Sequence, residues 1–179
     1  MLKKTQVHPK ADQVQRTAFS ARIQAYKKKG RPIVYIDESG FNHCMPRLRG
    51  YAKKGQRCFS NIDWHHRART NVIGAILGFT FITACLFEGT INADVFYAWL
   101  VADLLPKVPE KAVLVMDNAT FHKRKDIIQQ IKDKGHHLEF LPPYSPDLNP
   151  IEHKWFVAKA WRRKTGISIF QLFKHYDTL

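Results

Sequence analysis

The stretch Ala-Val-Leu-Val-Met-Asp at residues 112–117 is a short apolar run that ends in an acid, and it indicates the fold of this chain best. A second run, Ile-Val-Tyr-Ile-Asp at residues 33–37, has the same form. A carboxylate at the end of a buried strand is costly unless it is paired, protonated or bound to a metal. Asp37 and Asp117 therefore predict a site that requires negative charge, at one edge of a sheet.

The elements expected around these two runs predict a mixed α/β fold. The expected strands cover residues 33–37, 71–79, 81–88, 112–117 and 137–140. The expected helices cover residues 11–26, 92–105, 122–134 and 150 to beyond 161, with a further helical piece at 167–176. The first three strands are consecutive, whereas the later strands alternate with helices. This order predicts a sheet that is antiparallel at one end, parallel at the other and flanked by helices.

The basic residues are numerous and unevenly placed. The chain has 29 Lys and Arg against 15 Asp and Glu, a formal net charge of +14, and none of the Lys and Arg lie in residues 70–106. A core segment between basic surfaces predicts a polyanionic partner such as DNA. The candidate DNA contacts are Arg47, Arg49, Lys53, Lys54 and Arg57 after the first acid, and Lys159, Arg162 and Arg163 on the last long helix.

Cysteine usage and hydropathy bear on the compartment. Cys44, Cys58 and Cys85 are odd in number and form no Cys-x-x-Cys pair, which is typical of free thiols in a reducing compartment. The histidines and cysteines between residues 43 and 66 match no standard zinc-finger spacing. With no signal-peptide pattern and no apolar run of spanning length, we expect a cytoplasmic protein with no membrane partner.

A third acid, Glu152, lies in Leu-Pro-Pro-Tyr-Ser-Pro-Asp-Leu-Asn-Pro-Ile-Glu-His-Lys-Trp at residues 141–155. The prolines stiffen the loop before a helix and so fix the direction of the glutamate. If the strands of Asp37 and Asp117 are parallel neighbours, their carboxylates lie about 5 Å apart, close enough to share a cation. Oxygen ligands of this number favour Mg²⁺ or Mn²⁺.

Each acid also has a purely structural interpretation. Asp37 could cap the loop expected after its strand, with Glu38 as the functional acid instead. Asp117 could form an Asx turn. Asn149 and Glu152 have the spacing of a capping box at the start of a helix, with a proline at its first position.

Three segments taken together resemble the signature blocks of DDE transposases. They are Tyr-Ile-Asp-Glu-Ser-Gly-Phe-Asn at 35–42, Val-Met-Asp-Asn-Ala-Thr-Phe-His-Lys at 115–123 and the proline-rich block at 141–155. They are most similar to the bacterial insertion-sequence branch of the mariner superfamily. Thirty-four residues separate Asp117 from Glu152, a spacing typical of that branch. The match covers residues 31–165 and implies a ribonuclease H-like fold.

The resemblance also implies an activity. Asp37, Asp117 and Glu152 match the metal-binding triad, which uses two Mg²⁺ or Mn²⁺ ions for DNA cleavage at transposon ends and for strand transfer into a target duplex. Asn118 and His122 match the block that follows the second aspartate, and we expect them to support the site. A histidine that only bonds backbone at a helix start is the alternative for His122. A homodimer on DNA, in the bacterial nucleoid, is the expected assembly.

Full-length members of this branch carry helix-turn-helix domains ahead of the catalytic domain. We expect residues 1–30 to form a basic helix or linker and residues 31–179 to form the ribonuclease H-like catalytic domain. A separately encoded or frameshift-fused helix-turn-helix region is therefore a further expected partner. The alternatives are a truncated, inactive DNA-binding or dimerisation fragment, and a host nuclease on the same fold.

Overall fold

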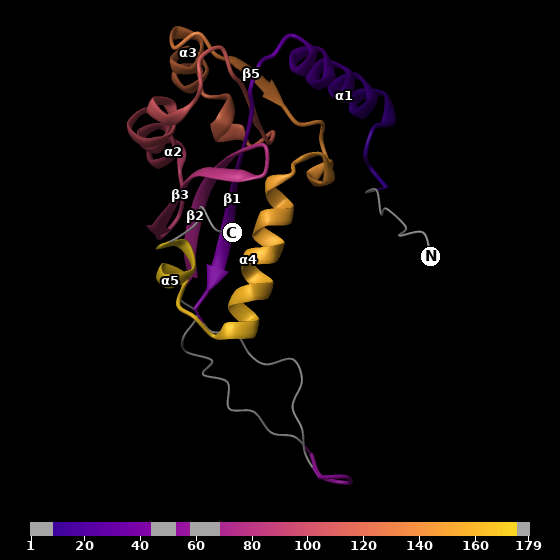
Figure 1. Ribbon diagram of the computed structural model, residues 1–179, viewed down its shortest axis with the longest axis vertical. Helices are drawn as coiled ribbons and strands as arrows, with labels where there is room; N and C mark the ends of the chain where they lie inside the picture. The colour runs from indigo at the N-terminus through magenta and orange to yellow at the C-terminus, as the bar shows by residue number, and fades with distance from the viewer. Residues whose placement is uncertain (1–8, 44–52, 58–68, 175–179) are drawn as a thin grey trace.

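The computed structural model describes residues 9–43, 53–57 and 69–174. In this part of the chain, five strands form one sheet in the order β3-β2-β1-β4-β5 (Figure 1). The strands are β1 (Ile33–Asn42), β2 (Arg69–Leu77), β3 (Thr80–Glu88), β4 (Val113–Met116) and β5 (His137–Phe140). β1, β2 and β3 pair antiparallel, whereas β1, β4 and β5 pair parallel. The predicted mixed sheet is confirmed.

Helices cover both faces of the sheet. They are α1 (Gln13–Lys28), α2 (Ala93–Trp99), α3 (Lys125–Asp133), α4 (Ile151–Thr165) and α5 (Ile169–Lys174). Short turns are a π-helix at Leu100–Leu104 and 3₁₀ helices at Leu105–Lys107, Thr120–Lys123 and Pro146–Leu148. One apolar core lies between the sheet and α1, α4 and α5, and a second lies between the sheet and α2 and α3. In Figure 1, α2 and α3 lie across the sheet from α4. No described helix is long and apolar enough to cross a bilayer.

Some helix boundaries differ from the expected ones, and local interactions explain where these helices begin and end. Asn92 caps α2, its side-chain oxygen accepting from Asp94 N at 3.1 Å and from Val95 N at 2.9 Å. The helix expected at 122–134 is divided, because Arg124 has an extended backbone between a 3₁₀ turn and α3. The last long helix ends at Gly166, whose left-handed backbone (φ 71°) suits glycine.

Alternation along two strands decides which side chains meet α4. On β1, Ile33 and Tyr35 belong to the α4 core. Val34 and Ile36 belong to the core on the opposite face. β4 follows the same rule, with Val113 and Val115 toward α4 and Leu114 and Met116 away from it. Since side chains alternate along a strand, Asp37 belongs to the series that faces α4.

β1 is longer than expected. The strand was expected to end at Asp37 and a loop to occupy 38–50, but β1 continues to Asn42 because β2 pairs with it as far as Asn42 and Arg69. β4, in contrast, pairs with β1 only as far as Tyr35 and Val115. One side of β1 is therefore without a strand partner from Ile36 onward, and Asp37 lies at that opening. The strand pair considered at 51–69 falls mostly outside the described residues.

Candidate active site

Parallel pairing of β1 with β4 places two of the predicted acids side by side. The last pair in the register joins Tyr35 to Val115. Two residues further along each strand are Asp37 and Asp117, so both acids lie at the same level of the sheet. The condition considered for these acids, that their strands are parallel neighbours, is met.

The three predicted acids line one pocket of about 270 Å³. Its wall consists of Asp37, Asp117, Asn118, Ala119, residues 141–146, Asn149 and Glu152. Among the described residues, no group of three or more His, Cys, Asp and Glu side chains is spaced closely enough to hold an ion. The carboxylates therefore share the pocket at wider spacing than ligands of one ion. Glu152 is exposed on the first turn of α4, so its side chain has room to change rotamer.

Asp37, on β1, is in contact with Trp155 of α4. The indole Nε1 donates a 2.9 Å hydrogen bond to Asp37 Oδ2. Trp155 is 1% exposed, so its ring lies in the core, and its contact with the acid was not foreseen from the sequence. Burial, with repulsion from Glu152 and Glu38, raises the pKa of Asp37 to about 8, although the Trp155 bond opposes this. The site thus disfavours a bare charge on Asp37.

A glycine allows the indole to lie there. Gly74 on β2 is the register partner of Asp37. A Cβ at Gly74 would lie 2.6 Å from Cη2 of Trp155, closer than such atoms pack. The missing side chain of Gly74 is what lets the Trp155 ring approach the sheet.

Asp117 has different partners. Its Oδ1 lies 2.7 Å from Nδ1 of His122 and accepts a 2.8 Å bond from Ala119 N. The Asx turn considered for Asp117 is therefore present, alongside its place in the pocket. The hydrogen bond with His122 is the largest cause that holds the pKa of Asp117 below its ordinary value, against the opposing effect of burial.

His122 joins two acids from different segments. Its ring is fully buried, and its Nε2 lies 3.0 Å from Glu38 Oε1. Phe96 and Phe121 pack against the imidazole, with ring centroids 4.5 and 4.2 Å away. Burial favours the neutral ring, but the hydrogen bonds to Asp117 and Glu38 outweigh it and raise the pKa of His122 to about 9. Carboxylates only accept, so both ring nitrogens donate in this arrangement.

The alternatives left open for His122 and Glu38 now have an answer in geometry. His122 lies in a 3₁₀ turn, but its ring bonds side chains of the site rather than backbone. Asp37, rather than Glu38, lines the pocket. Glu38 is instead the hydrogen-bond partner of His122, across a sequence separation of 84 residues.

The proline-rich loop is fastened at several points. Asn118 Nδ2 donates to Leu141 O, and the buried Ser145 donates to Pro143 O at 3.1 Å. Between them, Tyr144 has φ 54°, a left-handed backbone that costs a non-glycine residue roughly 1–2 kcal/mol. The Tyr144 side chain is 52% exposed and lines the pocket with the acids.

The capping box considered for Glu152 does not form. α4 begins at Ile151, and its N-cap, Pro150, has no side-chain capping hydrogen bond. The amide of Asn149 instead accepts a long bond from Ile151 N, at 3.4 Å, and donates to Ile36 O at 3.5 Å. The start of α4 is thereby tied to β1, and the glutamate carboxylate is left at the pocket.

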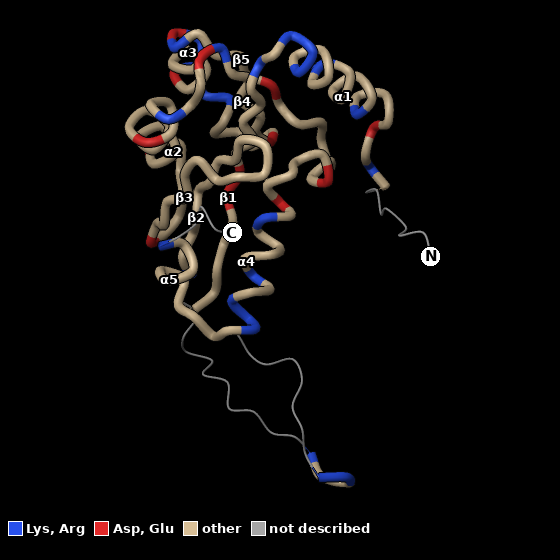
Figure 2. The backbone as a smooth tube through the Cα atoms, in the orientation of Figure 1, with Lys and Arg blue, Asp and Glu red and all other residues tan. Residues whose placement is uncertain are grey.

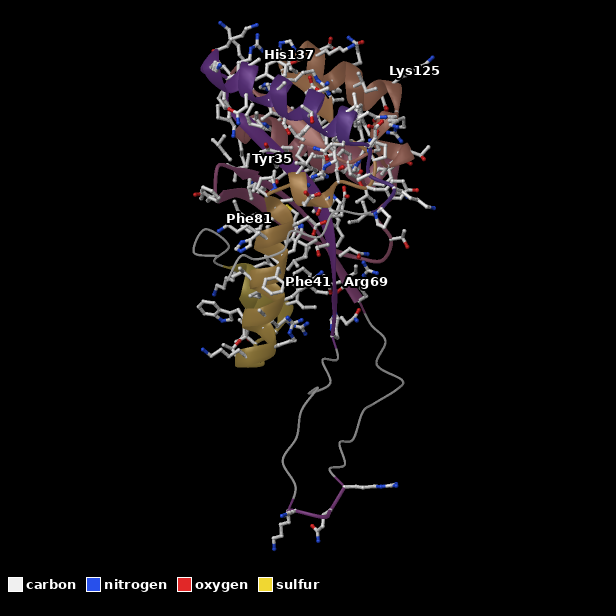
Figure 3. All side chains as sticks on the ribbon, turned by 90° about the vertical axis from the view of Figure 1, so that its right-hand side faces the viewer. Tyr35, Phe41, Arg69, Phe81, Lys125 and His137 are labelled. Carbon is white, nitrogen blue, oxygen red and sulfur yellow. The ribbon has the colours of Figure 1, made fainter. Side chains whose placement is uncertain are left out.

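Basic residues recur along α4 beyond Glu152, where Figure 2 colours several stretches of the tube blue. Lys159 is two turns beyond Glu152, and its Nζ lies 5.3 Å from the ring centroid of Phe41. Burial lowers the pKa of Lys159, which the charge of Glu152 partly opposes and that of Arg69 reinforces. Arg163 is exposed one turn further on. Arg69, which was not singled out in the sequence, lies with Phe41 at the far end of β1 and β2, as Figure 3 shows.

The structure contradicts the predicted exposure of Arg162 to DNA. Its side chain is buried, and its guanidinium donates to Asn42 O at 2.5 Å, His43 O at 3.0 Å and Ile167 O at 3.3 Å. These donors fasten α4 to the end of β1 and to the segment after α4. The residue has a structural function because it projects from the core stripe of α4.

The other predicted DNA contacts lie between residues 47 and 57, of which the structure describes residues 53–57. Lys53, Lys54 and Arg57 are exposed. They belong to the short described segment 53–57, which lies well away from the sheet in Figures 1 and 3. Arg47 and Arg49 lie outside the described residues.

α1 packs on the same core as α4 and contacts the proline-rich loop. Phe19 and Ile23 are buried in that core. Arg16 donates two hydrogen bonds to Asp147, of 2.8 and 2.6 Å. Tyr26 donates to Glu139 on β5 at 3.0 Å. The helix expected at 11–26 is confirmed, and it is joined to the sheet by these contacts.

Comparison with known proteins places these features in a family. Residues 32–171 match the family model described as DDE superfamily endonuclease. An uncharacterised protein of Sinorhizobium fredii, y4pE/y4sA, is 36% identical over 69 residues, which are 38% of this chain and 44% of that protein.

Solved structures of Mos1 mariner transposase share the fold. The paired-end complex with Mn superposes with a TM-score of 0.70 at 20% identity, over 91% of this chain and 53% of that one. The catalytic domain of Mos1 gives a TM-score of 0.61 at 18% identity, over 92% and 76% of the two chains. The chain thus spans about half of the Mos1 chain in the paired-end complex, and less than half of the Sinorhizobium protein. The ribonuclease H-like fold implied by the sequence is confirmed.

Proposed function

The chain belongs to the DDE superfamily of endonucleases, and from that premise we propose that it is the catalytic domain of a transposase that cleaves and joins DNA with divalent ions. We assign it to the bacterial insertion-sequence branch of the mariner superfamily. One observation carries the proposal: Asp37, Asp117 and Glu152, far apart in the sequence, line a single pocket. Basic side chains continue from that pocket along α4, where a phosphate backbone would run.

The donor set fits Mg²⁺ or Mn²⁺. Carboxylate oxygens are the ligands that these ions prefer, and the raised pKa of Asp37 is what a metal ligand displays when no cation offsets its neighbours. Asp37, Asp117 and Glu152 would hold two such ions, which would supply charge to activate a water and to stabilise a leaving oxygen. Mos1 structures with Mg and with Mn support this choice of ion.

The surrounding side chains orient the acids. One ring nitrogen of His122 is hydrogen-bonded to Glu38, and the other to Oδ1 of Asp117. The ring thereby fixes the rotamer of Asp117 and leaves the second carboxylate oxygen of Asp117 for the pocket. Trp155 does the same for Asp37. Asn118 ties the end of β4 to the proline-rich loop that precedes Glu152.

DNA contacts are assigned in two groups. Lys159 and Arg163, with Arg69 beside them, bind the phosphates next to the pocket. Lys53, Lys54 and Arg57 bind DNA further from the pocket, and Arg47 and Arg49 are further proposed DNA contacts. Transposon ends and a target duplex are the proposed DNA partners, and Mos1 paired-end complexes with transposon-end DNA support this.

The proposed organisation follows from the same premise. Residues 31–179 form the catalytic domain, and residues 1–30 form a basic linker whose helix packs on it. A homodimer assembles on DNA with a helix-turn-helix region, encoded separately or fused by frameshifting, in the cytoplasm.

Plasmid cleavage tests the proposal. The wild-type chain is expected to nick supercoiled DNA with Mn²⁺ or Mg²⁺, and Asp117→Asn is expected to lose at least about a thousandfold of that rate while it still binds DNA. Asp133→Asn, an exposed acid on α3, is the matched control and should cleave normally. Equal cleavage by wild type and Asp117→Asn would remove the assignment of the triad.

Two further readouts separate the alternatives. Mn²⁺ should raise the unfolding temperature of wild type but not of Asp117→Asn, because an ion that binds only the folded state stabilises it. No shift and no cleavage would indicate an inactive fragment. Joining of an oligonucleotide 3′ end to a target plasmid separates a transposase from a host nuclease, which would cleave without joining.

A further inference from the structure

Tyr144 combines features that the proposed chemistry does not use. It lines the pocket of the three acids, and its side chain is 52% exposed. Its backbone has φ 54°, in the left-handed region that glycine or asparagine adopts more readily. Only one other non-glycine residue of the described chain, Lys111, shares this conformation.

The surrounding loop holds the tyrosine in this conformation. Pro143 precedes it, and the buried Ser145 follows it and closes a hydrogen bond to Pro143 O. A backbone kept in a sparsely populated region at the rim of a pocket is typical of residues whose side chain is placed for a ligand.

The pocket lining combines two kinds of side chain. Asp37, Asp117 and Glu152 are acidic, which suits a phosphate bound through cations. Tyr144 adds an aromatic ring to the same pocket, and the other lining residues are the apolar Ala119, Leu141, Pro142, Pro143 and Pro146 and the neutral polar Asn118, Ser145 and Asn149. A nucleotide has the same two parts, a charged phosphate and a flat apolar base, and an exposed aromatic ring stacks on any base.

We infer that Tyr144 stacks on the nucleobase next to the scissile phosphate, so that the pocket takes a DNA strand with an unpaired end. This inference rests on the proposed function, because it requires DNA in the pocket. A base that stays stacked in the duplex offers no face to a protein ring, so the flanking base pair must open. The tyrosine is thus a specificity residue that favours frayed or unpaired ends over intact duplex.

Fluorescence of 2-aminopurine reports the stacking directly. The probe is a short duplex with a single-stranded 3′ overhang that carries 2-aminopurine, bound to the protein in Ca²⁺. Wild type and Tyr144→Phe should quench the probe, and Tyr144→Gly should not. The glycine variant should bind the overhang about tenfold or more weakly, since one stacked base contributes that much, and should bind blunt duplex as wild type does.

The glycine substitution suits the left-handed backbone, so loss of folding is not expected. Trp161→Ala is the matched control, because Trp161 is also 52% exposed but lies on the side of α4 opposite Glu152, nine residues further on. Equal fluorescence in the wild-type and Tyr144→Gly complexes, quenched or not, overturns the inference. Metal-dependent nicking by the same wild-type preparation shows separately whether the proposed function holds.

Discussion

Asp37 and Asp117 lie at the same level of neighbouring strands, yet their surroundings differ in charge. Asp117 faces the buried His122, which holds its pKa down. Asp37 faces an indole N–H, and burial with two neighbouring carboxyl groups raises its pKa to about 8. The protein itself stabilises one carboxylate in its charged, oriented form and disfavours charge on the other. The two acids are thus unequally prepared for the proposed cations.

Of the substitutions around the two aspartates, that of His122 should have the largest effect on the free energy of unfolding. His122→Asn removes a fully buried ring and leaves Asp117 and Glu38 without the group that joins them. Loss of one member of a buried ionic cluster costs about 3 kcal/mol or more in the free energy of unfolding. Urea unfolding in EDTA measures it.

The exposed His153→Asn provides the control and should unfold as wild type does. Adding Glu38→Gln to His122→Asn should restore part of the stability, because it removes one of the two unpaired charges. No restoration would mean that His122 acts only through packing.

A substitution at Gly74 tests the contact between the indole of Trp155 and Asp37. Gly74→Ala places a methyl group 2.6 Å from the Trp155 ring, which must move away from the sheet and from Asp37. We expect a loss of about 2 kcal/mol in the free energy of unfolding, typical of an overpacked core. In the Trp155→Phe background the smaller ring leaves room, so the two substitutions should be strongly non-additive. Additive losses would show that Gly74 and Trp155 do not constrain each other.

Removing the charge from each aspartate should give opposite results. Asp37→Asn should stabilise the metal-free protein by about 1.5 kcal/mol, because the pKa of Asp37 lies above its ordinary value of 3.8 and folding at neutral pH therefore opposes its charge. Asp117→Asn should destabilise it, since the pKa of Asp117 is lowered and its charge is favourable, but by less than about 1 kcal/mol because this side chain is 48% exposed. Unfolding in EDTA near pH 7 compares them. Changes of the same sign in both variants would contradict the proposed difference.

The sequence predicts the placement of the acids better than their surroundings. Apolar runs that end in Asp37 and Asp117, with helices between later strands, are sufficient to predict a mixed sheet with acids at strand ends, whereas the parallel pairing of their two strands entered only as a condition. The length of β1 was missed because Glu38, Ser39 and Gly40 look like a loop. Their pairing with β2, more than thirty residues away, decides otherwise.

Side-chain partners depend on tertiary structure in the same way. No local pattern joins Glu38 to His122, because the contact depends on where a 3₁₀ turn leaves the ring. Arg162 is different, since it lies seven residues past Trp155 and four past Ala158, on the buried stripe of α4. Helical periodicity would have assigned it to the core.

A smaller expected effect concerns the carboxyl group of Asp147. Its hydrogen-bond partner, Arg16, is charged at every accessible pH. The hydrogen bonds with Arg16 lower the pKa of Asp147, so its contribution to stability is present above about pH 4 and lost as the pH falls through the lowered value. Arg16→Gln should cost about 1 kcal/mol at pH 6, because Asp147 is partly exposed, and almost nothing below pH 3. Urea unfolding from pH 2.5 to 6 measures the difference, with Arg22→Gln, at an exposed arginine on the same helix, as control. If the cost were instead constant with pH, Arg16 would stabilise α1 by packing alone, and a lowered pKa would not be a dependable sign of a held carboxylate at Asp117 either.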